Sequence, residues 1–200
     1  MGDLLNMRAI SFVLGISSLA ALAISGETRQ SPSGSDSIQV VLLGQALIEH
    51  DPRPYLQAPL RTVTPILDSA DLVFANLEVA VRSEGCECVP TREGTYFHGT
   101  GPHVLDYLRD IKVNVLALSN NHSWDYGAAG IVSTISEVAD RGFTHAGTGA
   151  NLQEATAAGY RDVSGLKVAL VAMATVNNPP EAAATEEPGV NLLGIDDLAG

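Results

Sequence analysis

Three short apolar runs constrain the fold of this chain more than any other feature. Residues 38–43 read Ile-Gln-Val-Val-Leu-Leu, residues 72–75 read Leu-Val-Phe-Ala, and residues 113–118 read Val-Asn-Val-Leu-Ala-Leu. Runs of this length and composition are typical of strands buried on both faces of a parallel sheet. The sequence therefore predicts an α/β fold in which these segments are neighbouring strands.

Helical patterns between the runs complete a β-α-β alternation. Apolar residues along one side predict helices over 59–70, 102–111 and 127–141, and Gly142 is a stop signal for the third. Strands are expected at 143–146, 160–163 and 167–173, with a tight turn at Gly165 and a helix over 152–157. Residues 176–187 have the composition of a long loop.

The N-terminus has the pattern of a secretory leader. Arg8 is followed by the apolar residues 10–24 and by the small-x-small cleavage site Ala21-Leu22-Ala23. This stretch is shorter than the roughly 20 apolar residues of a membrane span, so cleavage is favoured over anchoring. We expect a signal peptide over 1–23, a flexible linker over 24–37, and a domain over 38–200. The protein would be exported to the periplasm or outside the cell, and would meet a membrane only through its leader or partner proteins.

The chain is strongly acidic, with 23 Asp and Glu against 11 Lys and Arg and a formal net charge of −12. Removing a leader that contains Asp3 and Arg8 leaves 22 acids and 10 bases, so the net charge is unchanged. Because no cluster of basic residues outweighs this field, the sequence predicts that the protein binds no nucleic acid. A metal cation would reverse the field locally.

Export would place Cys86 and Cys88 in an oxidising compartment, where paired cysteines often form a disulfide. One intervening residue gives a very small ring, however, and no Cys-x-x-Cys zinc or redox pattern is present. The sequence leaves open a disulfide, free thiols or a contact with a soft metal.

Polar residues follow each of the three predicted strands. The first run is followed by Gly44-Gln45 and then Glu49-His50-Asp51, the second by Asn76-Leu77-Glu78, and the third by Ser119-Asn120-Asn121-His122 with Asp125 beyond. Ligands of open α/β sheets bind beyond the carboxyl ends of the strands. Carboxylate, amide and imidazole groups can hold divalent cations, and a free histidine can protonate a leaving group. The pattern favours metal-assisted hydrolysis, for which a two-metal phosphoryl site is one form.

Local roles compete with this interpretation. Asn120 suits a turn or a helix cap, the Asn121-His122 pair suits a turn equally well, and Asp125 suits the start of a helix. The other histidines are expected to be surface or loop residues rather than ligands: His50, His98, His103 and His145.

The combination of segments resembles the capsule-synthesis CapA family of poly-γ-glutamate biosynthesis. The resemblance rests on residues 76–78, on the Asn-Asn-His-x-x-Asp-Tyr-Gly-x-x-Gly stretch at 120–130, and on Gly147-Thr148-Gly149 followed by Glu154-Ala155. That family is similar to calcineurin-like metallophosphatases, which implies an α/β sandwich around a metal pair. It also implies that this chain holds the N-terminal part of the fold only, because family members continue into a half with further His ligands.

The resemblance also implies roles for particular residues. Glu78 and Asn121 take the positions of metal ligands, His122 that of the general acid, and Asp125 that of the residue that orients His122. Gln45 stands where the family usually has an aspartate, so it would be a weaker ligand, and the candidates to compensate for it are His50 and Asp51. The implied cofactor is a divalent metal: Mn, Fe, Zn or Mg.

Three functions remain in competition at this point. The first is a metal-dependent phosphoesterase-like hydrolase that acts on an envelope polymer or its precursor. The second is a non-catalytic accessory subunit of an envelope-polymer synthesis or export complex, where repulsion of an anionic polymer makes a bridging cation or a membrane partner necessary. The third is a small-ligand-binding domain, which predicts an apolar pocket.

Overall fold

The computed structural model describes residues 18–25, 37–175 and 181–194. Most of the predicted signal peptide over 1–23 and of the predicted linker over 24–37 lies outside the described residues. The exceptions are strand β1, Ser18–Ser25, and residue 37. Among the helices in the described ranges, none is long and apolar enough to span a bilayer.

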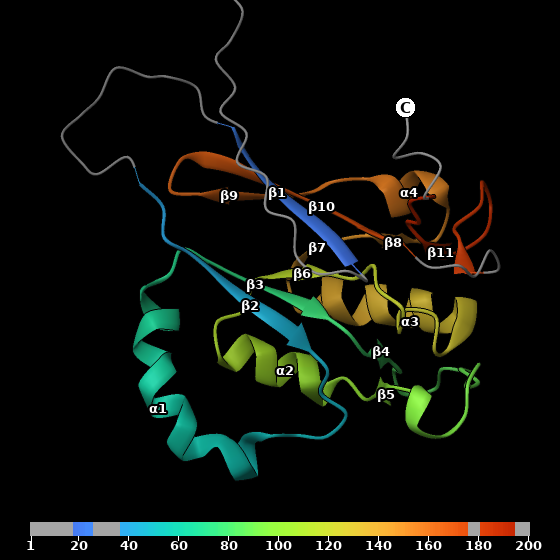
Figure 1. Cartoon of the computed structure of the whole chain (residues 1–200), viewed down its shortest axis with the longest axis horizontal. Coiled ribbons are helices and arrows are strands. Elements are labelled where there is room, and N and C mark those ends of the chain that lie inside the picture. Colours follow the sequence, from blue (N-terminus) through green and yellow to red (C-terminus); the bar gives the residue numbers. More distant parts are fainter. Residues whose placement is uncertain (1–17, 26–36, 176–180, 195–200) are drawn as a thin grey trace, which may run out of the picture.

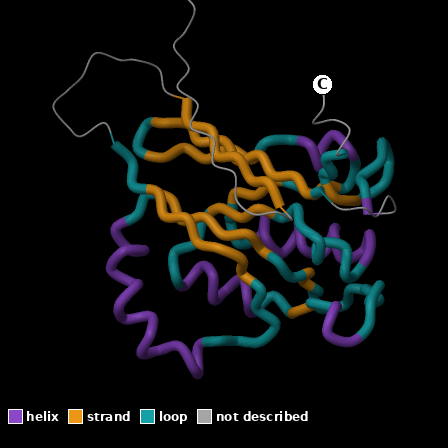
Figure 2. The backbone as a smooth tube through the Cα atoms, in the orientation of Figure 1, coloured by secondary structure: helices purple, strands orange, loops and turns teal. Residues whose placement is uncertain are grey.

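The described residues form three layers: helices, a parallel sheet and an antiparallel sheet (Figure 1). The parallel sheet has the order β2-β3-β6-β7, with strands Val40–Ala46, Leu72–Leu77, Val115–Ala117 and Thr144–Ala146. The second sheet has the order β1-β10-β9, where β10 is Leu166–Ala174 and β9 is Gly159–Val163. Helices α1, Arg53–Ser69, and α2, His103–Asp110, lie on the other side of the parallel sheet (Figure 2).

Two apolar cores join these layers. Leu105 and Leu108 of α2 pack with Val73 and Leu116 of the parallel sheet in the first core. Phe74 and Val115 face the other way and pack with residues of β9 and β10 in the second. Both faces of β3 are thus covered, and all six of its residues are buried, as the apolar run predicts.

Short elements complete the fold and close the edge where the parallel strands end. Strands β4, Ala80–Val81, and β5, Gly99–Thr100, pair with each other, as do β8, Thr148–Gly149, and β11, Gly189–Val190. A 3-10 turn spans Gly94–Tyr96 and a short helix, α4, spans Leu152–Thr156. The remaining helix, α3, spans Gly127–Asp140.

Most predicted elements are confirmed, including the two antiparallel strands β9 and β10. Gly165 lies between them with φ of 84°, and Gly142 follows α3 with φ of 74°, so both occupy the left-handed region that glycine tolerates. The mixed α/β sandwich expected from the sequence is therefore the fold of the described residues.

Two predictions about the first β-α unit are wrong. Strand β2 is at the edge of its sheet and mostly half-buried, with Leu42 36% exposed, because it pairs only with β3. Helix α1 begins at Arg53 rather than at Pro59, because Pro54 lies in its first turn, where a proline costs no hydrogen bond.

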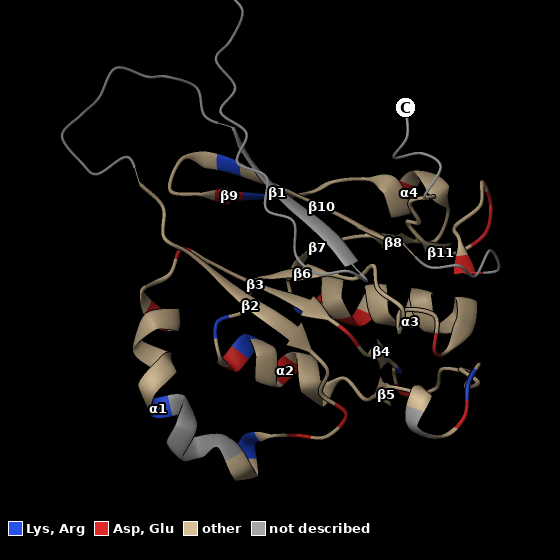
Figure 3. Ribbon diagram, viewed as in Figure 1, with Lys and Arg blue, Asp and Glu red and all other residues tan. Residues whose placement is uncertain are grey.

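The positions of the basic residues and of the two cysteines bear on two of the predictions. In Figure 3 Lys and Arg lie as isolated residues, with no continuous basic stripe on the described part of the chain in this view. Cys86 and Cys88 form a disulfide in the loop after β4, which answers the question that their spacing left open.

Candidate functional site

The candidate site lies beyond the carboxyl ends of β2, β3 and β6. The register places Gln45 of β2 opposite Asn76 of β3, and Asn76 opposite Ala117 of β6. The backbone N–H of Glu78 also donates to the carbonyl of Ala46 at 3.2 Å. The polar segments that follow these strands therefore meet at one edge of the sheet, as predicted.

Asn120 joins the second and third of these segments. Its side-chain amide donates to the Asn76 Oδ1 at 3.2 Å and to the Leu77 carbonyl at 2.8 Å. Its Oδ1 accepts the backbone N–H of His122 at 3.0 Å, which shapes the turn that presents His122. The turn role foreseen for Asn120 is therefore real, but this side chain, only 1% exposed, also fixes the distance between the strand ends.

His122 and Asp125 form a buried pair. His122 Nδ1 lies 2.9 Å from Asp125 Oδ2, and the side chain of Asp125 is completely buried. Because a carboxylate only accepts hydrogen bonds, Nδ1 is the donor, which leaves Nε2 of His122 for other partners. Asp125 precedes α3 without capping it, since the N-cap residue is Tyr126.

Asp125 is held from several sides. Its Oδ2 also accepts the backbone N–H of His98 at 2.7 Å, and its Oδ1 lies 3.3 Å from Nε of Arg92. This ion pair lacks hydrogen-bond geometry, so Oδ1 has a charge partner but no hydrogen-bond partner. Arg92 in turn pairs with the buried Glu181 at 2.9 Å. A position at the start of a helix therefore does not account for the contacts of the Asp125 side chain.

A second histidine lies beside this pair. His98 Nδ1 is 2.5 Å from Glu49 Oε1, and its ring makes an edge-to-face contact with the His122 ring at a centroid distance of 4.4 Å. The sequence predicts a surface or loop position for His98, and this residue does lie in a loop, but 80% of its side chain is covered. Only the proximity of Glu49 to the first strand end hinted at this arrangement.

Glu78 is a buried carboxylate whose negative charge has no ion-pair partner among the described residues. The residue is 4% exposed, and Asn76 Nδ2 donates to its Oε2 at 3.2 Å. No Lys, Arg or His among the described residues forms an ion pair with it. Buried carboxylates are normally paired or bound to metal, so the position favours a cation.

The neighbouring amides fit such a cation in part. The side chains of Gln45 and Asn121 form no hydrogen bond with any described residue, so both carbonyl oxygens are free to act as ligands, although Gln45 is exposed. Within the described ranges no group of three or more His, Cys, Asp and Glu residues could hold a metal. Of the three residues to which the resemblance assigns ligand roles, Glu78 is therefore the only charged one.

The remaining candidates are exposed, pair with another residue or lie in a helix or strand. His50 is exposed, and Asp51 pairs with Arg53 at 2.8 Å, an interaction that lowers the pKa of Asp51. His103 is the first residue of α2. His145 is in β7, where burial lowers its pKa, so the expectation of a surface or loop position is wrong for this residue.

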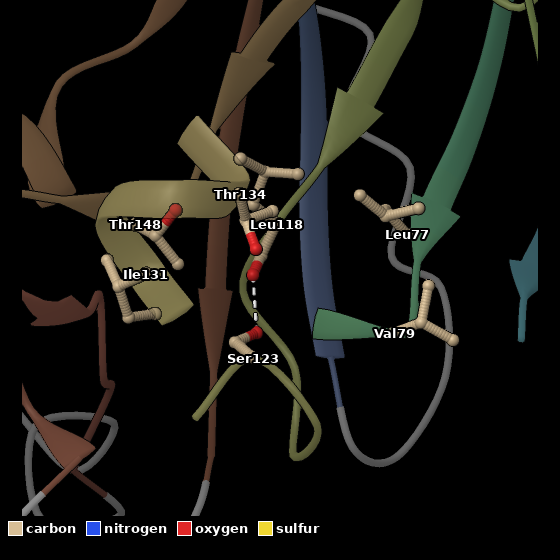
Figure 4. Close-up of a pocket in the computed structure, with 7 residues that line it drawn as sticks. All are labelled: Leu77, Val79, Leu118, Ser123, Ile131, Thr134 and Thr148. Carbon is tan, nitrogen blue, oxygen red and sulfur yellow. Dashed lines mark hydrogen bonds between the residues drawn. The ribbon is translucent and has the colours of Figure 1, made fainter. Parts of the chain in front are cut away.

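A small cavity lies behind the site, between β3, the turn at Ser123 and α3 (Figure 4). Its volume is about 10 Å³, and its lining is mainly apolar with three hydroxyl groups: Leu77, Val79, Leu118, Ser123, Ile131, Thr134 and Thr148. This is room for about one water molecule. The cavity is therefore too small to support the small-ligand-binding interpretation.

Fold and site together define an α/β sandwich protein with a polar site at the carboxyl edge of its parallel sheet. Within that class, the chain belongs to the family described as bacterial capsule synthesis protein PGA_cap, which matches residues 40–193. The resemblance to the CapA family is thereby confirmed.

Curated relatives agree with this assignment. The chain is 27% identical over 169 residues to the uncharacterized protein y4sH of Sinorhizobium fredii, covering 80% of this chain and 37% of that protein. It is 27% identical over 138 residues to Capsule biosynthesis protein CapA of Bacillus anthracis, covering 69% and 34%. It is 30% identical over 130 residues to PGA biosynthesis protein CapA of Bacillus subtilis, covering 64% and 33%. The chain spans about a third of the length of these relatives.

Proposed function

We propose that this domain carries a metal-assisted, phosphoesterase-like hydrolase site of the metallophosphatase type on an exported protein of capsule or poly-γ-glutamate biosynthesis. The observation that carries the proposal is the buried His122–Asp125 pair next to Glu78 on the neighbouring strand end. Family membership supports the biosynthetic setting, and the leader pattern supports export. Because the chain spans a third of its relatives, the substrate and partners of the whole protein belong to the same proposal.

His122 is the general acid of this site. Asp125 accepts a hydrogen bond from Nδ1 and so fixes the ring. Nε2 is therefore the atom that gives a proton to the leaving oxygen. The hydrogen bond from the His98 backbone and the charge of Arg92 keep Asp125 in place. A positioned acid of this kind contributes about 10²- to 10⁴-fold to a rate.

Glu78, Asn121 and Gln45 are the residues that would hold a divalent cation. When bound, the cation supplies Lewis-acid polarisation of the scissile group. Oxygen donors favour Mg²⁺ or Mn²⁺ over softer ions, while Zn²⁺ and Fe²⁺ remain in the set to be measured. With Gln45 neutral, we expect affinity below that of a site with a second carboxylate.

A non-catalytic accessory subunit of an envelope-polymer synthesis complex is the second candidate. Gln45 and the absence of a group of three acidic or histidine ligands in the described ranges favour it. In that case the cation at Glu78 would bridge the acidic protein to an anionic polymer, since direct binding is opposed by the net charge of −12.

Metal analysis and hydrolysis of two aryl phosphates separate these candidates. With Mn²⁺ or Mg²⁺, the purified chain should hydrolyse both phenyl phosphate and 4-nitrophenyl phosphate, and EDTA should abolish this. His122→Ala should retain the metal and lose about 10²-fold with phenyl phosphate, whose leaving group needs a proton, but much less with 4-nitrophenyl phosphate. Glu78→Gln should lose the metal and both activities.

The accessory interpretation gives a different result. A folded chain that hydrolyses neither ester at any metal concentration, yet binds poly-γ-glutamate only when a divalent cation is present, would replace the hydrolase proposal. Circular dichroism and thermal unfolding of each variant confirm that lost activity does not reflect a lost fold.

A further inference from the structure

The proposed chemistry gives no role to the side chain of His98. It lies between the first strand end, through Glu49, and the His122–Asp125 pair, through both its ring and its backbone. Glu49 is itself held, because Thr100 Oγ1 donates to its carbonyl at 2.9 Å. Glu49 and His98 are 49 residues apart in the chain, and His98 and Asp125 are 27 residues apart, yet the three residues meet at one point of the fold.

The backbone around His98 is fixed on both sides. The Phe97 ring packs edge-on against Tyr126 with a centroid distance of 5.0 Å, and the His98 carbonyl accepts the N–H of Ala80 at 3.0 Å. A Cβ added to Gly99 would lie 2.5 Å from the Phe97 ring and 2.6 Å from that of Tyr126. Such close packing leaves His98 little freedom, as expected of a residue that contacts a ligand.

The hydrogen bonds of His98 leave one ring nitrogen available. Glu49 takes Nδ1, and no described residue bonds to Nε2 of His98 or of His122. One-fifth of the His98 side chain and 11% of the His122 side chain remain exposed, so solvent reaches both rings. Two imidazoles of the same site are thus anchored by carboxylates in the same manner.

The distance between the rings limits what they can do together. The two imidazoles contact each other edge to face, with centroids 4.4 Å apart, so no ligand lies between them. A group that both rings reach therefore meets them from one side, as two neighbouring oxygens of a tetrahedral group would.

We propose that His98 binds an oxygen of a tetrahedral oxyanion through Nε2, next to the oxygen that His122 serves. The ligand class is a phosphoryl group, either as an ester or as free phosphate. This inference rests on the proposed function only for the identity of the site, because it requires no metal and no hydrolysis.

The charges around His98 permit an anion despite the acidic chain. Three carboxylates face this cluster, those of Glu49, Asp125 and Glu181, and each is paired with a histidine or with Arg92. A phosphate oxygen that approaches His98 therefore meets carboxylates of this cluster that already have partners. Nε2 of His98 is the ring atom on the side that these carboxylates leave open.

Binding of inorganic phosphate, followed by NMR of the histidine rings, tests the proposal. In EDTA at about pH 6, where an ordinary imidazole is mostly protonated, phosphate should shift the His98 ring signals in a saturable manner. His98→Phe keeps the edge-to-face contact and the backbone bond to Asp125, and should weaken binding about tenfold, the size of one charged hydrogen bond. Glu49→Gln should weaken it less, and Tyr160→Phe, at an exposed residue of β9 in the second sheet, should leave it unchanged.

Equal phosphate affinity in the wild-type chain and His98→Phe would overturn the proposal, as would an absence of saturable binding in a chain whose spectrum shows it to be folded. Failure of the hydrolase proposal is distinguishable from this. A chain that binds phosphate through His98 but hydrolyses no ester would refute hydrolysis alone, and a chain with metal-dependent hydrolysis but no effect of His98→Phe on phosphate would refute this inference alone.

Discussion

Two buried side-chain oxygens in the described part of the chain have no hydrogen-bond partner: Asp125 Oδ1 and Thr148 Oγ1. Arg92 compensates the first by its charge. Thr148 has no such compensation, and its hydroxyl belongs to the lining of the small cavity behind the site. An unpaired buried hydroxyl costs about 1–3 kcal/mol, so Thr148 lowers stability at a position within the family motif.

Replacing this hydroxyl with a methyl group should therefore stabilise the protein. We expect Thr148→Val to raise the free energy of unfolding by about 1 kcal/mol, measured by urea denaturation. The matched control is Thr134→Val, which lines the same cavity but removes an acceptor for the Val81 N–H at 2.9 Å, and it should lower stability by about 1–2 kcal/mol. A destabilising Thr148→Val would indicate that the cavity holds a water molecule.

The sequence predicted some site residues and missed others for identifiable reasons. His122 and Asp125 are three residues apart, so a local motif contains both partners of the pair. His98 and Glu49 are 49 residues apart, and only the pairing of β4 with β5 and the return of the chain past β2 bring them together. A sequence pattern holds no information about that contact.

At the scale of elements, patterns that depend on local spacing were reliable. Strands with both faces covered, such as β3, and helices with a Gly stop, such as α3, matched the expected positions. Strand β2 has an equally apolar sequence but lies at a sheet edge, and the apolar composition of one strand does not reveal how many neighbours it has. The burial of β2 was therefore the wrong prediction.

Strand β7 gives a prediction about pH. Burial lowers the pKa of His145 below its ordinary value of 6.5, so below about pH 6.5 the unfolded chain binds a proton that the folded chain does not. The His145 contribution to stability is thus present above that pH and lost as the pH falls. The unfolding free energy should decrease by at most about 1.4 kcal/mol per pH unit from this residue.

Urea titrations between about pH 7.5 and 5.5 measure this slope. His145→Gln should flatten the pH dependence, whereas His103→Gln, at the start of α2, should leave it as in the wild type. If His145→Gln retained the full slope, another titrating group would cause the pH dependence of the unfolding free energy, and the burial of His145 would not contribute to it.

At the scale of the whole molecule, the N-terminal strand is the part that the family match does not include. Strand β1 pairs with β10 from Ser18 opposite Ala174 to Ser25 opposite Lys167, outside the matched residues 40–193. The predicted cleavage near Ala23 would remove most of this strand. The same residues are therefore predicted to belong to the leader and found in the second sheet. Processing would leave β10 as an edge strand.

Hydrogen exchange measured on the full chain and on a chain that begins at Ile24 should resolve this competition. Strand β9 pairs with β10 only over Leu166–Leu170, so Val171–Met173 have β1 as their strand partner. In the shorter chain we expect amides among Val171–Met173 to exchange much faster, while those of Leu166–Leu170 that face β9 stay protected. Faster exchange throughout β10 would mean that β1 is needed to keep the second sheet together, so that an exported chain would require another strand in its place. Unchanged exchange at Val171–Met173 would instead mean that β1 adds no protection, so that cleavage near Ala23 would leave the fold as it is.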